Sequence, residues 1–297
     1  MLLGNYDLEE WNGNMLHWFD SVILGIVEGL TEFLPVSSTG HMILTNKLLG
    51  YDVAPEELKT FEIIIQFAAI LAISLVYRNK ILQVFGIGRK ESVRGLSVDA
   101  FPARRLNLLH VALAIVPPLG AAYLFRDYVK DDAFNTTPVL WALVVGGVYM
   151  WISEALYDSG RIKRTSETMD DITYKQALFI GIIQCVSALW PGFSRSGSTM
   201  AAGMLSGLSY RASADFSFFV AIPIMTVATG YELLSNLDQF RSGSIDLGFL
   251  ATGFIVSFVV AWIVVVAFLR MLQKIKLRYF AWYRFALAAL FYWFILR

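Results

Sequence analysis

The stretch GLTEFLPVSSTGHM, residues 29–42, interrupts a strongly apolar chain. Within fourteen positions it contains a carboxylate, a proline, four hydroxyl side chains, two glycines and a histidine. The whole chain has 297 residues, of which 57% are hydrophobic and 16% are charged. Its mean hydropathy of +0.58 is typical of an integral membrane protein. Because polar groups inside a membrane are costly, we interpret the interruption as functional.

Six segments are apolar over about the 20 residues that a helix needs to cross a bilayer. They are residues 60–77, 106–125, 138–157, 213–234, 247–270 and 279–296. The sequence therefore predicts an all-α polytopic membrane protein.

Basic residues are unevenly distributed among the connections between these spans. Residues 78–105, 158–173 and 270–278 are rich in Lys and Arg, whereas 126–137 and 235–246 are poor in them. Basic loops stay on the cytoplasmic side, so we expect the first group inside and the second outside. Both chain termini are then external.

Two further apolar segments, 19–50 and 174–208, are interrupted by glycine, proline and serine. GIVEGLTEFLPVSSTGH (25–41) aligns with GIIQCVSALWPGFSRSGS (181–198) when one residue is inserted after the proline. We interpret both segments as re-entrant helical hairpins, each followed by three spans. An odd number of spans inverts the second copy, and such repeats hold their sites near the bilayer midplane.

The predicted fold is a single membrane domain of residues 1–297, built as an inverted-topology repeat. Each half has one re-entrant hairpin and three transmembrane helices. The first repeat covers about residues 19–157 and the second about 174–297, and residues 1–18 are an N-terminal extension. The alternative is a coincidental likeness between two Gly/Pro-rich segments.

The two hairpins have the residues of paired anion sites. Pro35 and Pro191 end the entering helices, and a cluster of hydroxyl residues precedes each second helix. Serine and threonine cap the free N–H groups there, and the positive end of the helix dipole attracts anions. Two such starts suit a ligand with two linked anionic groups, such as a diphosphate. On the nearby span, Glu62 and Gln66 share a helix face and are candidates for a supporting role.

Charged side chains beside the helix starts indicate phosphoryl chemistry. Glu28 and Glu32 are spaced i,i+4, so their carboxylates lie on one face of the helix. Two carboxylates would repel an anionic ligand unless a hard divalent cation lay between them. Arg195 offers a planar fork that suits phosphate oxygens. Ser38 is the best candidate nucleophile, because His41 follows it by three residues on the same first turn.

Each of these residues also has a purely structural interpretation. Glu28 and Glu32 would then lie at a helix end at headgroup level. His41 would bond a neighbouring carbonyl, and Arg195 would extend to the headgroups. The hydroxyl residues would only cap helices; they are Ser37, Ser38, Ser194, Ser196 and Thr199.

EGLTEFLPVSSTGH (28–41) and PGFSRSGST (191–199) together resemble the motifs of the undecaprenyl-pyrophosphate phosphatase family, the bacitracin-resistance type. The resemblance extends from about residue 20 to the C-terminus. It includes DDITYKQALFIG (170–181) and the YRF of the last span (283–285).

The resemblance implies roles for individual residues. Glu28 and Glu32 would be the acidic pair that holds a divalent cation, either Mg²⁺ or Ca²⁺. Ser38 would be the reacting hydroxyl with His41 as its neighbour, and Arg195 would bind phosphate. The supporting phosphate ligands would be Ser37, Ser194, Ser196 and Thr199.

The resemblance also implies an activity and a location. The reaction would be hydrolysis of undecaprenyl diphosphate, which recycles the lipid carrier for peptidoglycan synthesis and confers bacitracin resistance. The partners would be the polyprenyl diphosphate, membrane lipids and a second copy of the chain in a homodimer. The location would be the bacterial inner (plasma) membrane, with the active site open to the external face. The net charge of zero gives no reason to expect a nucleic-acid partner.

Two mechanisms and two functions stay open at this point. Ser38 attacks in line while His41 relays a proton, or water attacks directly with a glutamate or His41 as its base. A polyprenyl-phosphate transporter or flippase would use the same midplane anion site. A carrier needs no nucleophile beside its ligand, and this favours the phosphatase.

Overall fold

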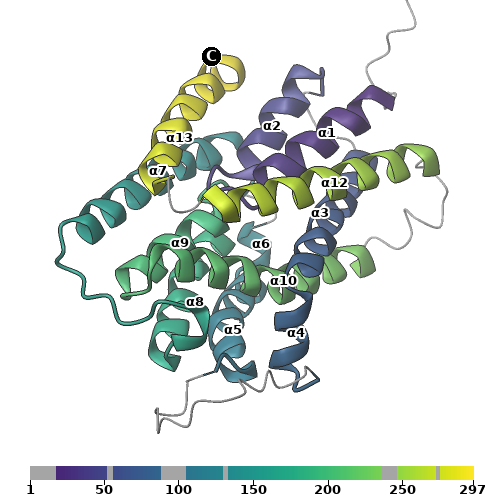
Figure 1. The fold of residues 1–297 in the computed structure, drawn as a ribbon. Helices are drawn as coiled ribbons and strands as arrows, with labels where there is room; N and C mark the ends of the chain where they lie inside the picture. Colours follow the sequence, from purple (N-terminus) through teal and green to yellow (C-terminus); the bar gives the residue numbers. More distant parts are fainter. Residues whose placement is uncertain (1–17, 52–55, 88–104, 130–132, 236–245, 272–274) are drawn as a thin grey trace, which may run out of the picture.

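The computed structural model describes residues 18–51, 56–87, 105–129, 133–235, 246–271 and 275–297. These residues form a bundle of helices (Figure 1). Their only β-type contact is an isolated bridge between Ser166 and Leu208. The first half has α1 (Trp18–Thr31), α2 (Ser38–Leu48), α3 (Glu56–Val76), α4 (Arg78–Val84), α5 (Leu108–Leu124), α6 (Arg126–Tyr128) and α7 (Thr136–Asp158). The second half has η2 (Met169–Asp171), α8 (Tyr174–Leu189), α9 (Arg195–Leu205), α10 (Tyr210–Ser235), α12 (Leu247–Met271), α13 (Leu277–Phe291) and η3 (Tyr292–Leu296).

Within the described residues, five helices are long and apolar enough to cross a membrane. They are α7, α10 and α12, together with Leu58–Val76 of α3 and Leu277–Leu296 of α13 and η3. The chain is therefore a multi-pass membrane protein, as predicted. The expected span 106–125 is the shorter helix α5, whose 17 residues end where Phe125 leaves the helical conformation (φ −109°, ψ 24°). An apolar helix is therefore present at the predicted position, but it is shorter than the five long spans.

Each of the two interrupted segments forms a pair of short helices. A turn at Pro35 joins α1 to α2, and a turn at Pro191 joins α8 to α9. Both prolines lie after the end of the entering helix, as expected from the lost N–H group and the clash with the preceding turn. The extension 1–18 lies outside the described residues, except for Trp18.

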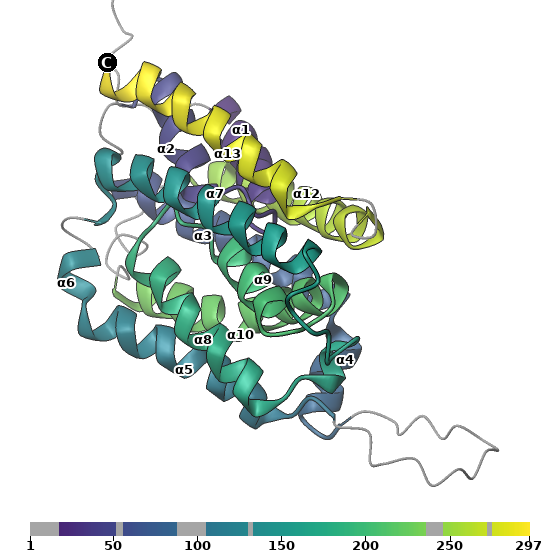
Figure 2. The same cartoon turned by 90° about the vertical axis from the view of Figure 1, so that its left-hand side faces the viewer.

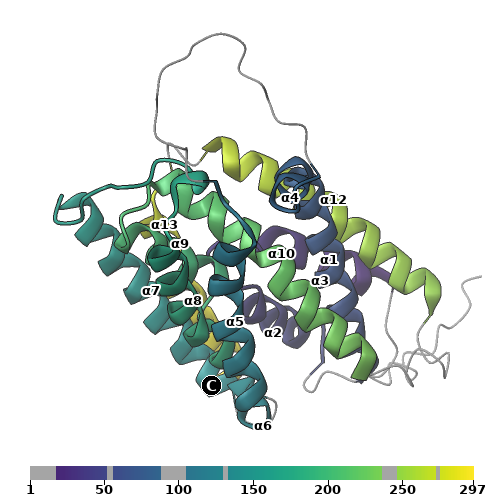
Figure 3. The same cartoon turned by 90° about the horizontal axis from the view of Figure 1, so that it is seen from below.

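The first helix of each hairpin packs against a helix from the other half of the chain. The pairs α1–α12 and α5–α8 have the most extensive contacts in the bundle. Figure 2 shows α5 and α8 side by side, and Figure 3 shows the bundle from below. Small residues allow the close approach: a Cβ on Gly29 would lie 2.8 Å from the Ser257 carbonyl oxygen, and one on Gly181 would lie 2.4 Å from the Leu113 carbonyl oxygen.

Helix α9 lies inside the bundle. Its residues Ser196–Met204 are all buried, and the helix packs against α7, α8 and α10. The large apolar cluster around it joins Met200 of α9 to Phe216 of α10 and Ile70 of α3. The polar first turn of α9 is therefore held among apolar side chains rather than on a surface loop.

The close packing of α1 on α12 gives a prediction for Gly29→Ala. The new Cβ would meet backbone atoms 2.8 to 2.9 Å away, so we expect the free energy of unfolding to fall by about 1–3 kcal/mol. Gly230→Ala is the matched control, because a Cβ on Gly230 would meet no atom within 4 Å. Thermal unfolding of both variants in detergent measures the difference, and equal stabilities would contradict the packing.

Candidate active site

Helices α2 and α9 begin with the same unusual backbone conformation. Ser37 (φ 74°, ψ 96°) caps α2, and Ser194 (φ 75°, ψ 109°) caps α9. Among the described residues they are the only non-glycine residues with positive φ. Each hydroxyl oxygen accepts a hydrogen bond from the amide three residues later, from Gly40 at 3.3 Å and from Gly197 at 3.1 Å. Backbone strain of this kind is concentrated at functional sites.

The turn before α9 is a type II β-turn. The Phe193 N–H donates to the Trp190 carbonyl oxygen at 3.1 Å, with Pro191 and Gly192 between them. Gly192 has φ 93°, which the third position of this turn requires. A side chain at Gly192 would also crowd the Val139 carbonyl oxygen, 3.0 Å from the Cβ position. Gly192 is therefore the extra residue of the second hairpin, and it lies in a tight, crowded turn.

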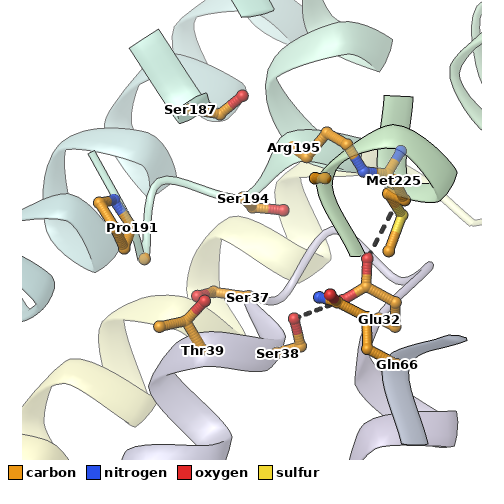
Figure 4. Close-up of a pocket in the computed structure, with 12 residues that line it drawn as sticks. Glu32, Ser37, Ser38, Thr39, Gln66, Ser187, Pro191, Ser194, Arg195 and Met225 are labelled. Atoms are coloured by element: carbon orange, nitrogen blue, oxygen red, sulfur yellow. Dashed lines mark hydrogen bonds and ion pairs between the residues drawn. The ribbon is translucent and has the colours of Figure 1, made fainter. Parts of the chain in front are cut away.

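A cavity of about 180 Å³ lies between the two helix starts (Figure 4). Its wall combines both hairpins with Gln66 of α3 and Met225 of α10. The remaining polar lining residues are Glu32, Ser37, Ser38, Thr39, Ser187, Ser194 and Arg195. The structure therefore brings together five of the predicted site residues from segments far apart in the sequence.

Glu32 lies in the wall of this cavity and connects the two hairpins. The Ser38 hydroxyl donates to one carboxylate oxygen of Glu32 at 2.6 Å. Arg195 Nη2 donates to the other carboxylate oxygen at 3.3 Å. The Glu32 and Arg195 side chains are only 6% and 15% exposed, so solvent screens this ion pair weakly. A carboxylate in this position can accept the serine proton, and the guanidinium beside it can bind phosphate.

His41 does not make the contact that we expected. Its Nδ1 bonds the Ser37 carbonyl oxygen at 2.7 Å, and its Nε2 bonds the Tyr283 hydroxyl at 2.7 Å. The two rings are also stacked, with an interplanar angle of 8°. The partner of the Ser38 hydroxyl is Glu32, so the predicted pairing with His41 is wrong. Side chains on a helix point back toward its N-terminus, and here this brings the ring onto the Ser37 carbonyl.

Comparison with known proteins shows the family of this chain. The model of the bacitracin resistance protein BacA family matches residues 21–290. This chain belongs to that family. Undecaprenyl-diphosphatase 1 of Bacillus thuringiensis (strain Al Hakam) is 43% identical over 277 residues, covering 92% of this chain and 97% of that protein. Undecaprenyl-diphosphatase of Geobacillus kaustophilus (strain HTA426) is 42% identical over 287 residues, covering 93% of this chain and 98% of that protein.

The predicted phosphate ligands Ser196 and Thr199 do not line the cavity of this BacA-family chain. The Ser196 hydroxyl donates to the Leu34 carbonyl oxygen at 3.0 Å and so links the second hairpin to the first. The Thr199 hydroxyl bonds the Arg195 carbonyl oxygen at 2.8 Å and the Ser217 hydroxyl of α10. Both side chains are 1% exposed. In this structure they hold the α9 start in place, and they do not face the cavity.

Glu28 lies one helical turn before Glu32 and does not line the cavity. Its side chain is buried, and its Oε1 has no hydrogen-bond partner. In the described ranges, no three His, Cys, Asp or Glu side chains are placed to hold a metal ion. The orphaned oxygen nevertheless fits a divalent cation that takes its other ligands from Glu32, phosphate and water, since hard cations prefer oxygen ligands.

Some cavity residues have a recognisable pattern in the sequence and others do not. Gln66 lines the cavity as its helix face suggested, whereas Glu62 accepts a hydrogen bond from Asn46 at 2.7 Å. Ser187 and Met225 were missed, because a serine or methionine in an apolar helix has no distinctive pattern. The contact of Tyr283 with His41 was missed as well. Its only signal was the YRF motif of the family.

The positive φ at the two caps predicts an unusual order of stability at Ser194. Ser194→Ala loses a capping hydrogen bond, worth about 1 kcal/mol, and keeps the strain at φ 75°. Ser194→Gly loses the same bond but adopts positive φ freely, so it should be more stable than the alanine variant. Thermal unfolding in detergent should rank serine first, glycine next and alanine last. An alanine variant as stable as the glycine variant would contradict the strained cap.

Proposed function

We propose that this chain hydrolyses undecaprenyl diphosphate to undecaprenyl phosphate and inorganic phosphate. The observation that carries the proposal is the Glu32 carboxylate, bonded on one side to the Ser38 hydroxyl and on the other to Arg195. A nucleophile, a base and a phosphate-binding group thus share one cavity. The relatives that are named undecaprenyl-diphosphatases support the identity of the lipid. The reaction would recycle the lipid carrier for peptidoglycan synthesis, and would thereby confer bacitracin resistance.

In the proposed mechanism Ser38 attacks the terminal phosphorus in line with the leaving undecaprenyl phosphate. The new Oγ–P bond forms as the phosphoanhydride P–O bond breaks, and the serine proton passes to Glu32. Arg195 and the free amides of the two helix starts stabilise the charge on the transferring phosphoryl group. Water then cleaves the phosphoserine. In the alternative mechanism water attacks directly and Glu32 takes the proton of that water.

His41 was expected to relay the proton of Ser38, but its contacts support a structural part in this mechanism. Because Nδ1–H donates to the Ser37 carbonyl, the neutral ring accepts the Tyr283 proton at Nε2. His41 therefore supports the strained cap of α2. The proton relay beside Ser38 belongs to Glu32.

A divalent cation, Mg²⁺ or Ca²⁺, is part of the proposal. Glu28 and Glu32 would hold it, and it would neutralise part of the phosphate charge. The unpartnered Oε1 of Glu28 supports this ligand role.

The finer topology is also proposed. The two halves would form an inverted repeat, with 78–105 cytoplasmic, both termini external and the cavity open to the external face. The matching caps at Ser37 and Ser194 and the reciprocal pairs α1–α12 and α5–α8 support the repeat. Most basic residues of the connection 78–105 lie outside the described residues, as do residues 236–245 of the connection 235–246. The polyprenyl tail would lie in the bilayer, and the protein would be a homodimer.

The direct test is phosphate release from undecaprenyl diphosphate by the purified protein in detergent micelles. We expect one phosphate for each undecaprenyl phosphate formed. Saturable binding of the lipid without phosphate release would instead support a polyprenyl-phosphate transporter or flippase with the same site.

The nucleophile is tested by Ser38→Ala and Ser37→Ala as a matched pair. Ser38→Ala should abolish turnover, and Ser37→Ala should keep most of it because it loses only a cap worth about 1 kcal/mol. Glu32→Gln should slow turnover by about 10²–10⁴-fold, since it removes the base. Quenched-flow with lipid labelled in its terminal phosphate should trap label on Ser38. Substantial turnover by Ser38→Ala would leave direct water attack as the mechanism.

Metal dependence is tested by titrating chelator and Mg²⁺ or Ca²⁺ against turnover. If Glu28 is a ligand, Glu28→Gln should raise the metal concentration at half activity, and excess metal should partly restore the rate. Glu32→Gln should not be restored in this way, because it also lacks the base. Equal metal dependence of wild type and Glu28→Gln would exclude the ligand role of Glu28.

The orientation is tested with single cysteines in a Cys185→Ala background. Ser235 and Gln83 are exposed positions in two connections of opposite predicted side. Ser235→Cys should react with an impermeant maleimide on intact cells, and Gln83→Cys should react only after permeabilisation. Labelling of both from one side would contradict the proposed topology.

A further inference from the structure

Arg284 of α13 is a completely buried cation whose hydrogen bonds all go to backbone. It is 0% exposed. Its Nε donates to the Leu143 carbonyl oxygen at 3.2 Å, and its Nη2 donates to those of Ala142 and Gly192, each at 2.9 Å. In the described part of the chain it bonds no carboxylate, and its Nη1 has no partner. In the sequence it is the middle residue of the YRF in the last span.

A buried charge without a counter-ion is expensive, and apolar residues of similar volume usually stabilise a core better. A residue needed only for packing would therefore not be an arginine. The guanidinium offers what an apolar side chain cannot, which is a planar set of donors that holds several acceptors at once. The role of Arg284 therefore depends on which carbonyl groups it bonds.

One of them is the Gly192 carbonyl, in the type II turn that leads into α9. Gly192 lines the cavity, and Arg195 follows it by three residues. The turn is otherwise closed by a single hydrogen bond, from the Phe193 N–H to Trp190. The two carbonyls of α7 that Arg284 also holds belong to a rigid helix. Arg284 thus fixes the turn to α7, and with it the position from which Arg195 reaches into the cavity.

The packing of α7 on α13 is adapted to this contact. The two helices run side by side (Figure 2), and α7 has Gly146 where the guanidinium passes. A Cβ on Gly146 would lie 2.4 Å from Arg284 Nη2 and 2.6 Å from the Phe193 carbonyl oxygen. Any side chain there would displace either the guanidinium or the turn.

We propose that Arg284 is a positioning residue for the phosphate-binding start of α9, and that it acts on Arg195 through the Gly192 carbonyl. The proposal rests on the proposed phosphatase function, since turnover is its readout. A misplacement of about 1 Å in a positioned group can slow an enzyme by about 10²-fold, so loss of the anchor should be visible in kcat.

The test is a double-mutant cycle between Arg284→Gln and Arg195→Lys. Arg284→Gln alone should lower kcat by about 10- to 100-fold with a smaller change in KM. In the Arg195→Lys background, the same change should lower kcat by no more than about threefold, because residues that act through one another are not additive. A purely structural role predicts equal factors in both backgrounds, and that result would overturn the proposal.

Two further variants keep the outcome unambiguous. Arg284→Lys keeps the charge, but its single Nζ cannot occupy the positions of both Nε and Nη2, so this variant should resemble Arg284→Gln. Wild-type kcat in this variant would overturn the proposal, because it would show that charge alone matters. If Arg284→Gln is not recovered folded, Gly146→Ala takes its place in the cycle, and full activity of Gly146→Ala would overturn the proposal.

The control is Arg211→Gln, which removes an arginine that is 52% exposed, pairs with Asp215 and does not line the cavity. It should keep wild-type kcat, and it measures the effect on the purified protein of losing an arginine outside the cavity. An inactive wild type would refute the proposed function itself. An active wild type with additive Arg284 effects would refute only the positioning role.

Discussion

A helix that begins inside a membrane protein leaves its first N–H groups without partners in its own turn, and no bulk water is there to satisfy them. This chain contains two such starts, at Ser38 and Arg195, each preceded by a serine with positive φ that caps the third amide. The remaining amides are available to an anion. Most of the distinctive features of the fold serve to hold these two starts close together.

The holding contacts come from every side of the bundle. Gly29 and Gly181 let the entering helices pack closely on α12 and α5, which anchors each hairpin to the opposite half. The Ser196 hydroxyl bonds the Leu34 carbonyl and links the hairpins directly. Two residues of α13 also contribute. Tyr283 bonds His41 of α2, and Arg284 bonds the turn before α9. Such an over-determined scaffold can keep strained backbone in place.

Glu32 gives the two starts an asymmetry that a pure binding site would not need. The two hairpins match in their caps, yet Ser38 occupies one first-turn position and Arg195 the equivalent position of the other. Glu32 lies between them and bonds both. An anion that replaces the carboxylate as the partner of Arg195 would leave Glu32 free to act on the Ser38 hydroxyl. In the proposed mechanism, this one shared carboxylate would connect phosphate binding to proton transfer.

The sequence alone determined the short helices, their caps and the family, because proline, serine and glycine act through local backbone geometry and leave their signal in the order of residues. It also placed Glu32, Ser38 and Arg195 in one site, because the repeat of the two hairpins predicted that they meet. Only the tertiary structure decided the partner of Ser38, the inward direction of Ser196 and Thr199, and the anchoring contacts of Arg284. Those depend on which way a side chain points and on what a distant helix presents to it, and neither leaves a mark in local sequence.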